Sequence, residues 1–455
     1  MPRREATTRG PLVGRALLRV THRLRGSRTL EILNEIQQTP FSSREAVRAD
    51  QFARLRRLLT HAEARVPYYR ELFRSLGVSS RDIRNLDDFA KLPVLTKDII
   101  RERKMDLIRD DVRVEDLQTH HSGGSTGVPL TFHREQVYMD ASEAGTYRNL
   151  MQCGWRPGEM AAFFWGGNAK LDAMAPWEFT LRQKLRRMYQ LDPFHSGPAE
   201  MERWLRQWDR IGATVALGYA STIARFADFV LAKGRTLPLQ GAFTTAEKLY
   251  PQQRASIERA FECRAYDLYG SSEVQNIAAE CSQSRMHVNA DFVVLETEAP
   301  ADGSPVRPFL VTSLWNYAMP FIRYRNEDCG ELGSETCTCG NNFPLMTLNI
   351  ARVSDNFTLP SGRVVHGEYF THMMYGTKGI ATFQFHQTAR DAFTLLIVPT
   401  DSTDDARARA DAIRAAADEL RRLDPGHEIK VDVREVPSIP LSNAGKHRFT
   451  RSDAQ

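Results

Sequence analysis

The chain has 455 residues and a mass of 51.7 kDa, which is too long for one ordinary core and predicts two or three domains. Hydrophobic residues make up 42% and charged residues 26%, so the composition is typical of a globular protein and excludes wholesale disorder. The net charge of +5 is small, and the first 28 residues, with eight arginines and one glutamate, account for it. The remainder is close to neutral, which argues against nucleic acid as the main partner.

The N-terminal segment and the cysteine content indicate the cellular compartment of the protein. No apolar stretch approaches the ~20 residues needed to cross a bilayer, and the N-terminus lacks the apolar segment of a signal peptide. Residues 12–24 are expected to form a short basic amphipathic helix, for which a solvated helix or arm is favoured over contact with a membrane surface. Six cysteines do not make a disulfide framework. The expected location is therefore a reducing cytoplasm, where clustered cysteines indicate a metal.

Helical and extended patterns alternate along the chain. Residues 29–110 are predicted to be mostly helical, with apolar residues at helical spacing in 52–62. From 115 to about 350, short apolar runs alternate with helical segments, which predicts an α/β architecture with mixed sheets. The clearest of these runs are 161–165, 214–217, 292–295 and 309–311.

The pattern changes after Arg352. Two strands are predicted at 383–385 and 393–398, followed by a helix over 404–423 and a half-buried strand in which Ile429, Val431 and Val433 alternate with polar residues. This unit predicts a small separate α+β domain. We therefore expect a basic arm at 1–28, a large domain at 29–352 and a small domain at 353–455.

One Gly-rich segment is the most informative part of the sequence. It consists of Ser122, Gly123, Gly124, Ser125, Thr126 and Gly127. Three glycines let successive backbone N–H groups converge, and with hydroxyl donors around them such a concavity binds a polyphosphate. It is neither a Walker A loop, since no lysine follows, nor the dinucleotide fingerprint. These residues alone leave a flexible surface turn as the alternative.

Five further segments follow the Gly-rich segment in chain order. They are Thr245-Ala246-Glu247, Tyr269-Gly270-Ser271-Ser272-Glu273, the run from Met319 to Asp328, Arg352, and Gly445-Lys446. The six together resemble the motifs of the phenylacetate–CoA ligase family of adenylate-forming enzymes, from about residue 30 to the end. The resemblance implies an adenylate-forming fold, in which a large N-terminal α/β domain with mixed sheets carries a small mobile α+β C-terminal domain.

The resemblance also implies roles for residues of the large domain. The Gly-rich segment would hold the β- and γ-phosphates of ATP, and Ala246 and Glu247 would lie on the adenine side. Tyr269 would lie against the adenine, and Asp328 would accept hydrogen bonds from the ribose hydroxyls. Glu273 would hold Mg²⁺, a hard cation that binds few carboxylates together with phosphate oxygens. Each of these residues also has an ordinary structural interpretation, such as a core tyrosine or a solvated acid.

The resemblance also assigns roles to two residues of the small mobile domain and its hinge. Lys446 would bridge the acyl carboxylate and the α-phosphate during adenylation, a task that suits a point charge on a flexible stem. Arg352 would lie at the hinge about which the small domain pivots between two reaction steps. The chain departs from the family pattern at this hinge, because Ala351 and Ser354 replace a glycine and an aspartate. It departs again where Asn326-Glu327 replaces a common Thr-Gly, which weakens the case for an unmodified thioester-forming cycle.

A second cluster offers metal ligands. It comprises Cys281, His287, Cys337 and Cys339. Three thiols and one imidazole suit a closed tetrahedral zinc site, although the spacing alone leaves buried free cysteines as the alternative. Some relatives resemble this arrangement and carry a structural zinc. Such a metal would join the Glu273 region to the Asp328 region.

These inferences predict an ATP-dependent, AMP-forming ligase. A small, aryl or other organic acid would be activated as its adenylate and passed to coenzyme A, with Mg²⁺ and a structural Zn²⁺ as cofactors. An amine or a carrier-protein thiol is the alternative acceptor, and a zinc-stabilised scaffold without turnover is the competing class. Retention of Glu273 and Lys446 argues against the scaffold. The sequence leaves the identity of the acid and the oligomeric state open, a homodimer included.

Overall fold

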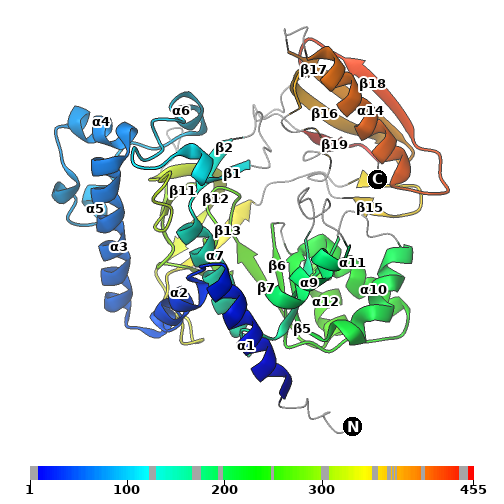
Figure 1. Ribbon diagram of the computed structural model, residues 1–455, viewed down its shortest axis with the longest axis horizontal. Helices are drawn as coiled ribbons and strands as arrows, with labels where there is room; N and C mark the ends of the chain where they lie inside the picture. The colour runs from blue at the N-terminus through cyan, green and yellow to red at the C-terminus, as the bar shows by residue number, and fades with distance from the viewer. Residues whose placement is uncertain are drawn as a thin grey trace.

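The protein is described here from a computed structural model. It describes residues 9–121, 130–165, 176–192, 198–246, 249, 251–298, 307–350, 357–365, 370, 374, 377–400, 405–439 and 449–454. The N-terminal helices and the antiparallel strands lie on one side of the molecule, and the parallel strands with their covering helices occupy the other. The small C-terminal sheet lies next to the parallel strands (Figure 1).

The N-terminal segment is helical, as its periodicity predicts. The helices are α1 (Arg9–Leu24), α2 (Thr29–Ile36), α3 (Arg44–Arg65), α4 (Pro67–Leu76), α5 (Leu86–Phe89) and α6 (Lys97–Glu102). Helix α3 begins after Ser43, whose side chain accepts a hydrogen bond from the Ala46 N–H. It ends at Arg65 because Val66 precedes a proline and is extended. Its inward face is fully buried and comprises Leu55, Leu58, Leu59 and Ala62.

One mixed sheet of 11 strands forms the centre of the molecule, in the order β10-β11-β12-β13-β9-β8-β7-β6-β5-β3-β4. Its bounds are β3 (Met160–Phe164), β4 (Met188–Leu191), β5 (Ala213–Tyr219), β6 (Gly241–Thr245), β7 (Arg264–Tyr269), β8 (Ala278–Glu280), β9 (Met286–Val288), β10 (Val293–Thr297), β11 (Pro308–Ser313), β12 (Tyr324–Gly333) and β13 (Leu345–Ile350). The strands from β4 to β7 are parallel, and those from β7 to β10 are antiparallel. The predicted α/β architecture with mixed sheets is confirmed.

Helices connect the parallel strands, as crossover connections require. They are α9 (Pro176–Arg186), α10 (Pro198–Ile211), α11 (Ala220–Ala232) and α12 (Pro251–Phe261), and α7 (Gln136–Met151) precedes them in the chain. Their apolar faces and the parallel strands share one core, in which Trp204 and Phe226 are fully buried. None of the helices in the described ranges combines the length and apolar character needed to cross a bilayer.

The C-terminal unit has its own sheet and its own core. Its elements are β14 (Phe357–Thr358), β15 (Val364–Val365), β16 (Ile380–Ala389), β17 (Ala392–Pro399), α14 (Ala406–Arg422), β18 (Lys430–Glu435) and β19 (Thr450–Ser452), with the four-stranded order β18-β17-β16-β19. Leu395, Ile397 and Leu420 are fully buried in this core. Val433 is 37% exposed, contrary to the half-buried strand that we predicted, because β18 is an edge strand. The domain limits at residues 28 and 352 stay predictions.

A buried acidic pair connects β7 to its neighbours. The Asp267 carboxylate accepts a hydrogen bond from the Thr244 hydroxyl at 3.1 Å, and the Asp267 N–H donates to Glu280 at 2.8 Å. Glu280 also pairs with Arg254 at 2.7 Å. Burial raises the pKa of Asp267 to about 7, and the nearby Glu280 charge acts in the same direction. The folded protein therefore binds a proton at Asp267 across a pH range where the unfolded chain, with an ordinary pKa of 3.8, has lost it.

We expect the free energy of unfolding to fall as the pH rises from about 4 to about 7 and to level off above that. In this window the unfolded chain has released the Asp267 proton and the folded protein still binds it, so each rise in pH favours the unfolded chain. Asp267→Asn keeps the oxygen that accepts from Thr244 and cannot ionise. The variant should melt about 3 °C or more above the parent at pH 8 and close to it at pH 5, as measured by differential scanning fluorimetry. The exposed Asp209→Asn on α10 is the control. Equal shifts at both pH values would contradict the assignment.

Candidate functional site

Tyr269 and Asp328, two residues that the resemblance assigned to the nucleotide, lie in direct contact. Tyr269 ends β7 and Asp328 lies on β12, and both are buried. The Tyr269 hydroxyl donates to Asp328 Oδ2 at 2.9 Å. Asn326 Nδ2 donates to the same hydroxyl at 2.8 Å, and Asn326 Oδ1 accepts from the Asp328 N–H at 3.2 Å. The three side chains thus fix the orientation of the Asp328 carboxylate.

Ala246 lies at the same edge of the sheet. It follows β6 directly and adopts φ +67°, a left-handed conformation that is uncommon for alanine and is found preferentially at functional sites. In the register between β6 and β7, Thr244 faces Asp267, so the next positions bring Ala246 level with Tyr269. Carboxyl ends of adjacent parallel strands are the usual ligand edge of an open α/β sheet.

Glu273 lies in the turn after β7, and among the described residues only one of its two oxygens has a hydrogen-bond donor. Its side chain is 2% exposed, and Oε1 accepts a hydrogen bond from the Tyr324 hydroxyl at 3.1 Å. Oε2 is buried and has no hydrogen-bond partner among the described residues. A buried carboxylate oxygen without a donor is costly unless a cation or another donor satisfies it. Glu273 therefore fits the magnesium ligand that the resemblance implies.

Arg134 is a residue of this site that sequence reasoning missed. It ends β2 (Thr131–Arg134) and is 2% exposed, with its guanidinium over the rings of Phe132 at 4.9 Å and Tyr138 at 4.8 Å. Its Nη2 donates to the Ser272 carbonyl, next to Glu273. Burial lowers the pKa of Arg134, while the charge of Glu273 acts in the opposite direction. The motif supplied no signal for Arg134, because its contact with Ser272 depends on tertiary folding.

Strand β2 follows the Gly-rich segment in the chain. It pairs with β1 (Gln118–His121) in an antiparallel hairpin, and His121 faces Thr131 in the register. Residues 122–129 connect these two strands and lie outside the described residues, as do Glu247, Arg352 and Lys446. The structure therefore brings together Ala246, Tyr269, Glu273 and Asp328 at one sheet edge, and the hairpin of β1 and β2 contacts the Glu273 turn through Arg134.

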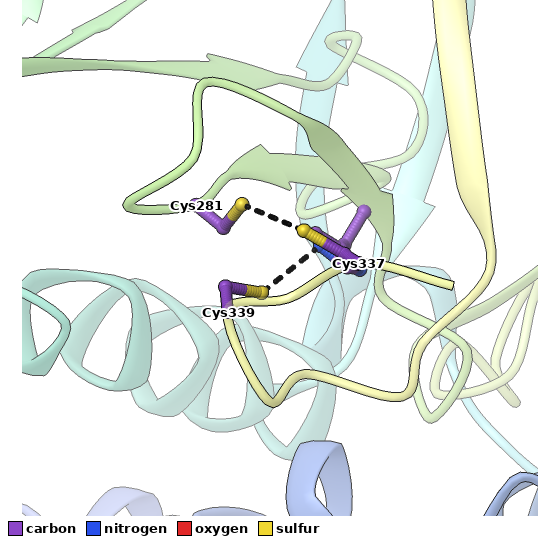
Figure 2. Close-up of side chains that lie close together, drawn as sticks. Cys281, Cys337 and Cys339 are labelled. Carbon is purple, nitrogen blue, oxygen red and sulfur yellow. Dashed lines mark hydrogen bonds between the residues drawn. The ribbon is translucent and has the colours of Figure 1, made fainter. Parts of the chain in front are cut away.

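The predicted metal ligands form one compact cluster. Cys281, His287, Cys337 and Cys339 place their ligand atoms within 4.8 Å of one another. Cys281 Sγ lies 3.7 Å from Cys337 Sγ, and Cys339 Sγ lies 3.4 Å from His287 Nε2 (Figure 2). A tetrahedral zinc ion with ordinary bond lengths requires S···S and S···N edges of about 3.8 and 3.5 Å. The cluster therefore matches the size of a zinc site.

Several contacts of the cluster favour metal-binding protonation states, whereas burial raises the pKa of Cys339 to about 12, so that its thiolate forms only with a bound cation. His287 Nδ1 lies 2.9 Å from the Phe343 carbonyl oxygen. When Nδ1–H donates to this carbonyl, Nε2 is left for a metal. Burial lowers the pKa of His287 and so favours the neutral ring that coordinates. The backbone N–H groups of Gln283 and Asn341 donate to the sulfurs of Cys281 and Cys339, each at 3.4 Å. Such donors stabilise thiolates.

The cluster also joins distant segments of the chain. Cys281 follows β8, whereas Cys337 and Cys339 lie between β12 and β13. Asn342 next to them donates to the Pro40 carbonyl at 2.7 Å and to the Ser42 carbonyl at 2.9 Å, before α3 begins. A bound metal would thus hold the sheet and the N-terminal helices together.

Comparisons with known proteins test the resemblance to phenylacetate–CoA ligases that the sequence motifs indicated. No family model matches the chain. The phenylacetate-coenzyme A ligase of Thermus thermophilus is 28% identical over 330 residues, 69% of this chain and 72% of the relative. Protein CapK of Staphylococcus aureus is 23% identical over 404 residues, 84% of each chain. The Escherichia coli phenylacetate-coenzyme A ligase is 26% identical over 64% of this chain and 68% of its own length. The predicted resemblance to the phenylacetate–CoA ligases is confirmed.

Solved structures confirm the fold. A 2-hydroxyisobutyryl-CoA ligase crystallised with 2-HIB-AMP and CoA in its thioesterification state is 20% identical, with a TM-score of 0.61 over 92% of each chain. The same ligase in a postadenylation state has a TM-score of 0.55 over 91% of each chain. This chain therefore has the adenylate-forming fold.

We predict one zinc per chain, with loss of most of it in Cys339→Ser, because a serine hydroxyl is a poor replacement for a thiolate ligand. Without the metal, the loop between β12 and β13 loses its attachment to β8, and the melting temperature should fall by about 5 °C or more. Inductively coupled plasma mass spectrometry and scanning fluorimetry measure the two effects.

The matched control for this experiment is Cys153→Ser, which changes a free cysteine outside the cluster. Its zinc content should equal that of the parent. Purified parent protein without bound metal after expression in zinc-supplemented medium, or equal zinc in the parent and Cys339→Ser, would contradict the metal assignment.

Proposed function

We propose that the protein activates a small carboxylic acid with ATP, forming an acyl-adenylate and pyrophosphate, and then transfers the acyl group to coenzyme A with release of AMP. The observation that carries this proposal is the buried Glu273 carboxylate with an unsatisfied oxygen, one turn away from the Tyr269–Asp328 pair. The match to acid–CoA ligases in sequence, and to a CoA-bound ligase in fold, supports the same reaction class.

The described residues have distinct tasks in the first step. Asp328, held by Tyr269 and Asn326, would accept hydrogen bonds from the ribose hydroxyls and so orient the nucleotide. Glu273 would hold Mg²⁺, which when bound neutralises charge on the phosphates. Arg134 would keep the Glu273 turn in place through the Ser272 carbonyl. The step is mainly positioning and charge stabilisation, because ATP itself supplies the leaving group.

Two further roles, one in adenylation and one between the two steps, are proposed for residues outside the described ranges. Lys446 would neutralise charge between the acyl carboxylate and the α-phosphate during adenylation, and Arg352 would lie where the small domain pivots to admit coenzyme A. We propose an aryl acid as the first substrate class to test. Three relatives named phenylacetate-coenzyme A ligase align with this chain over 68% or more of their own length. The 2-hydroxyisobutyryl-CoA ligase adds a small hydroxy acid to the panel.

Glu273→Gln tests the nucleotide site. The amide keeps the size of the side chain and removes its charge, so acid-dependent ATP–pyrophosphate exchange should fall about 100-fold or more. Exchange is measured with a panel that contains phenylacetate, benzoate and 2-hydroxyisobutyrate. Glu331→Gln is the matched control, because this glutamate lies exposed on β12 and should leave exchange unchanged.

Two outcomes of this experiment would overturn the proposal. If Glu273→Gln retains full exchange while its zinc content and melting temperature are those of the parent, the metal role of Glu273 is wrong. If no acid in a broad panel supports exchange by the parent protein, the competing interpretation, a zinc-stabilised scaffold without turnover, is favoured. Acyl transfer to an amine without coenzyme A would instead identify the alternative acceptor.

Lys446→Ala should separate the two steps. We expect ATP–pyrophosphate exchange to fall about 100-fold or more, because the ammonium group stabilises charge only during adenylation. Thioester formation from synthetic acyl-adenylate and coenzyme A should stay within about threefold of the parent, since that step does not use the lysine. Lys378→Ala, at an exposed lysine of the C-terminal unit, serves as the control. Undiminished exchange in Lys446→Ala would show that the lysine does not take part.

A further inference from the structure

Helix α1 exposes an apolar strip to solvent. Leu12, Val13, Val20 and Leu24 are 68%, 67%, 54% and 83% exposed. The opposite face of the same helix is buried, with Leu18 in the main core. Exposed apolar residues that follow one strip of a helix, rather than being scattered singly, indicate an interaction surface.

Cationic side chains border this strip. Arg15, Arg19 and Arg23 recur every four residues and are exposed, which at 100° per residue places them along one side of the apolar strip. No acidic residue lies within α1, and no ion pair to these three arginines occurs in the described part of the chain. The long arginine stems can lie along apolar material while their guanidinium groups reach anions.

Helix α9 extends the same surface. Its exposed face carries Trp177, Leu181 and Lys184 at spacings of four and three residues, and Trp177 and Leu181 are 67% and 49% exposed. The two helices pack together, and the Thr21 hydroxyl of α1 donates to the Leu185 carbonyl of α9 at 3.4 Å. Figure 1 shows them side by side. Tryptophan with an exposed ring is characteristic of the boundary between a membrane and water.

The inner face of α1 is fixed tightly, which holds the exposed strip in one orientation. Gly14 contacts the loop before β3 so closely that an added Cβ would lie 2.1 Å from the Gly158 carbonyl oxygen. Leu18 is 2% exposed beside this contact. The strip therefore belongs to the folded body of the protein.

We propose that α1 and α9 together dock on the surface of an anionic lipid membrane, with the apolar side chains among the acyl chains and the arginines at the headgroups. A second copy of the chain is a poorer occupant, because two such faces would oppose their arginines. Nucleic acid is also poorer, because aliphatic side chains gain nothing from phosphates. The sequence favoured a solvated helix or arm at these residues, and the docking surface is proposed as an alternative to it.

The experiment is co-sedimentation with vesicles of phosphatidylcholine alone and of phosphatidylcholine with 30% phosphatidylglycerol. We expect binding to the anionic vesicles that is at least tenfold stronger than to the neutral ones and that weakens as salt rises. Arg19→Gln should weaken it about fivefold and Leu12→Ser about tenfold or more.

The control variants carry the same changes elsewhere on the surface. They are Arg407→Gln on α14 and Leu76→Ser on α4, both at exposed positions, and they should bind as the parent does. Melting temperature and, where the parent shows it, ATP–pyrophosphate exchange should be unchanged in all variants, so failure of the proposed catalytic function stays distinguishable from failure of docking.

Three outcomes would overturn the proposal. The first is absence of binding to anionic vesicles at low salt. The second is equal binding of Leu12→Ser, Arg19→Gln and the parent. The third is a dimer in light-scattering chromatography that Leu12→Ser dissociates while no vesicle binding occurs, which would assign the strip to a second copy of the chain.

Discussion

The hydrogen bond between Tyr269 and Asp328 requires the central sheet to curl. Strands β7 and β12 are not neighbours, because β8, β9 and β13 lie between them. In a flat sheet their separation would be four strand spacings, about 19 Å at the usual ~4.8 Å each. The tyrosine hydroxyl nevertheless lies 2.9 Å from the Asp328 carboxylate. The antiparallel part of the sheet must therefore bend back on itself, and this curvature brings the two nucleotide residues together.

The cysteine and histidine cluster acts on the same curved strands. Cys281 follows β8, His287 lies on β9, and the two remaining cysteines lie in the connection from β12 to β13. These four strands are the ones whose curvature places Tyr269 near Asp328. A metal at the cluster would restrain this curvature without touching substrate. Its effect on activity would then come through the position of Asp328, which is a structural role.

The local patterns of the sequence predicted elements well where one face is buried. On α3, Leu55, Leu58, Leu59 and Ala62 recur at helical spacing and are fully buried. The strand pattern at 393–398 corresponds to β17. The prediction that Val433 is buried was wrong, because an alternating pattern does not reveal that a strand lies at the edge of its sheet.

The site was predictable only where a motif carries it. Tyr269, Glu273 and Asp328 came from segments with a recognisable order, and the structure brings them together. Arg134 and the role of Tyr324 were not predictable, because both depend on contacts between residues more than 50 positions apart in the chain. Asn326 looked like a departure from the family pattern. In the structure its side chain forms hydrogen bonds with both Asp328 and Tyr269 that orient them, so the substitution is compatible with a nucleotide site.

The C-terminal unit contacts the large sheet near the carboxyl ends of its parallel strands, the edge at which Ala246 and Tyr269 lie. Tyr219 ends β5 and belongs to the C-terminal core, and Trp165 stacks on it with ring centroids 4.5 Å apart. Both residues follow the carboxyl ends of parallel strands, as Ala246 and Tyr269 do. The proposed pivot of the C-terminal unit would separate Tyr219 from the C-terminal core and so uncover this edge. Helix α1 lies at the far end of the molecule from β16–β19, so docking through α1 leaves that pivot unobstructed (Figure 1).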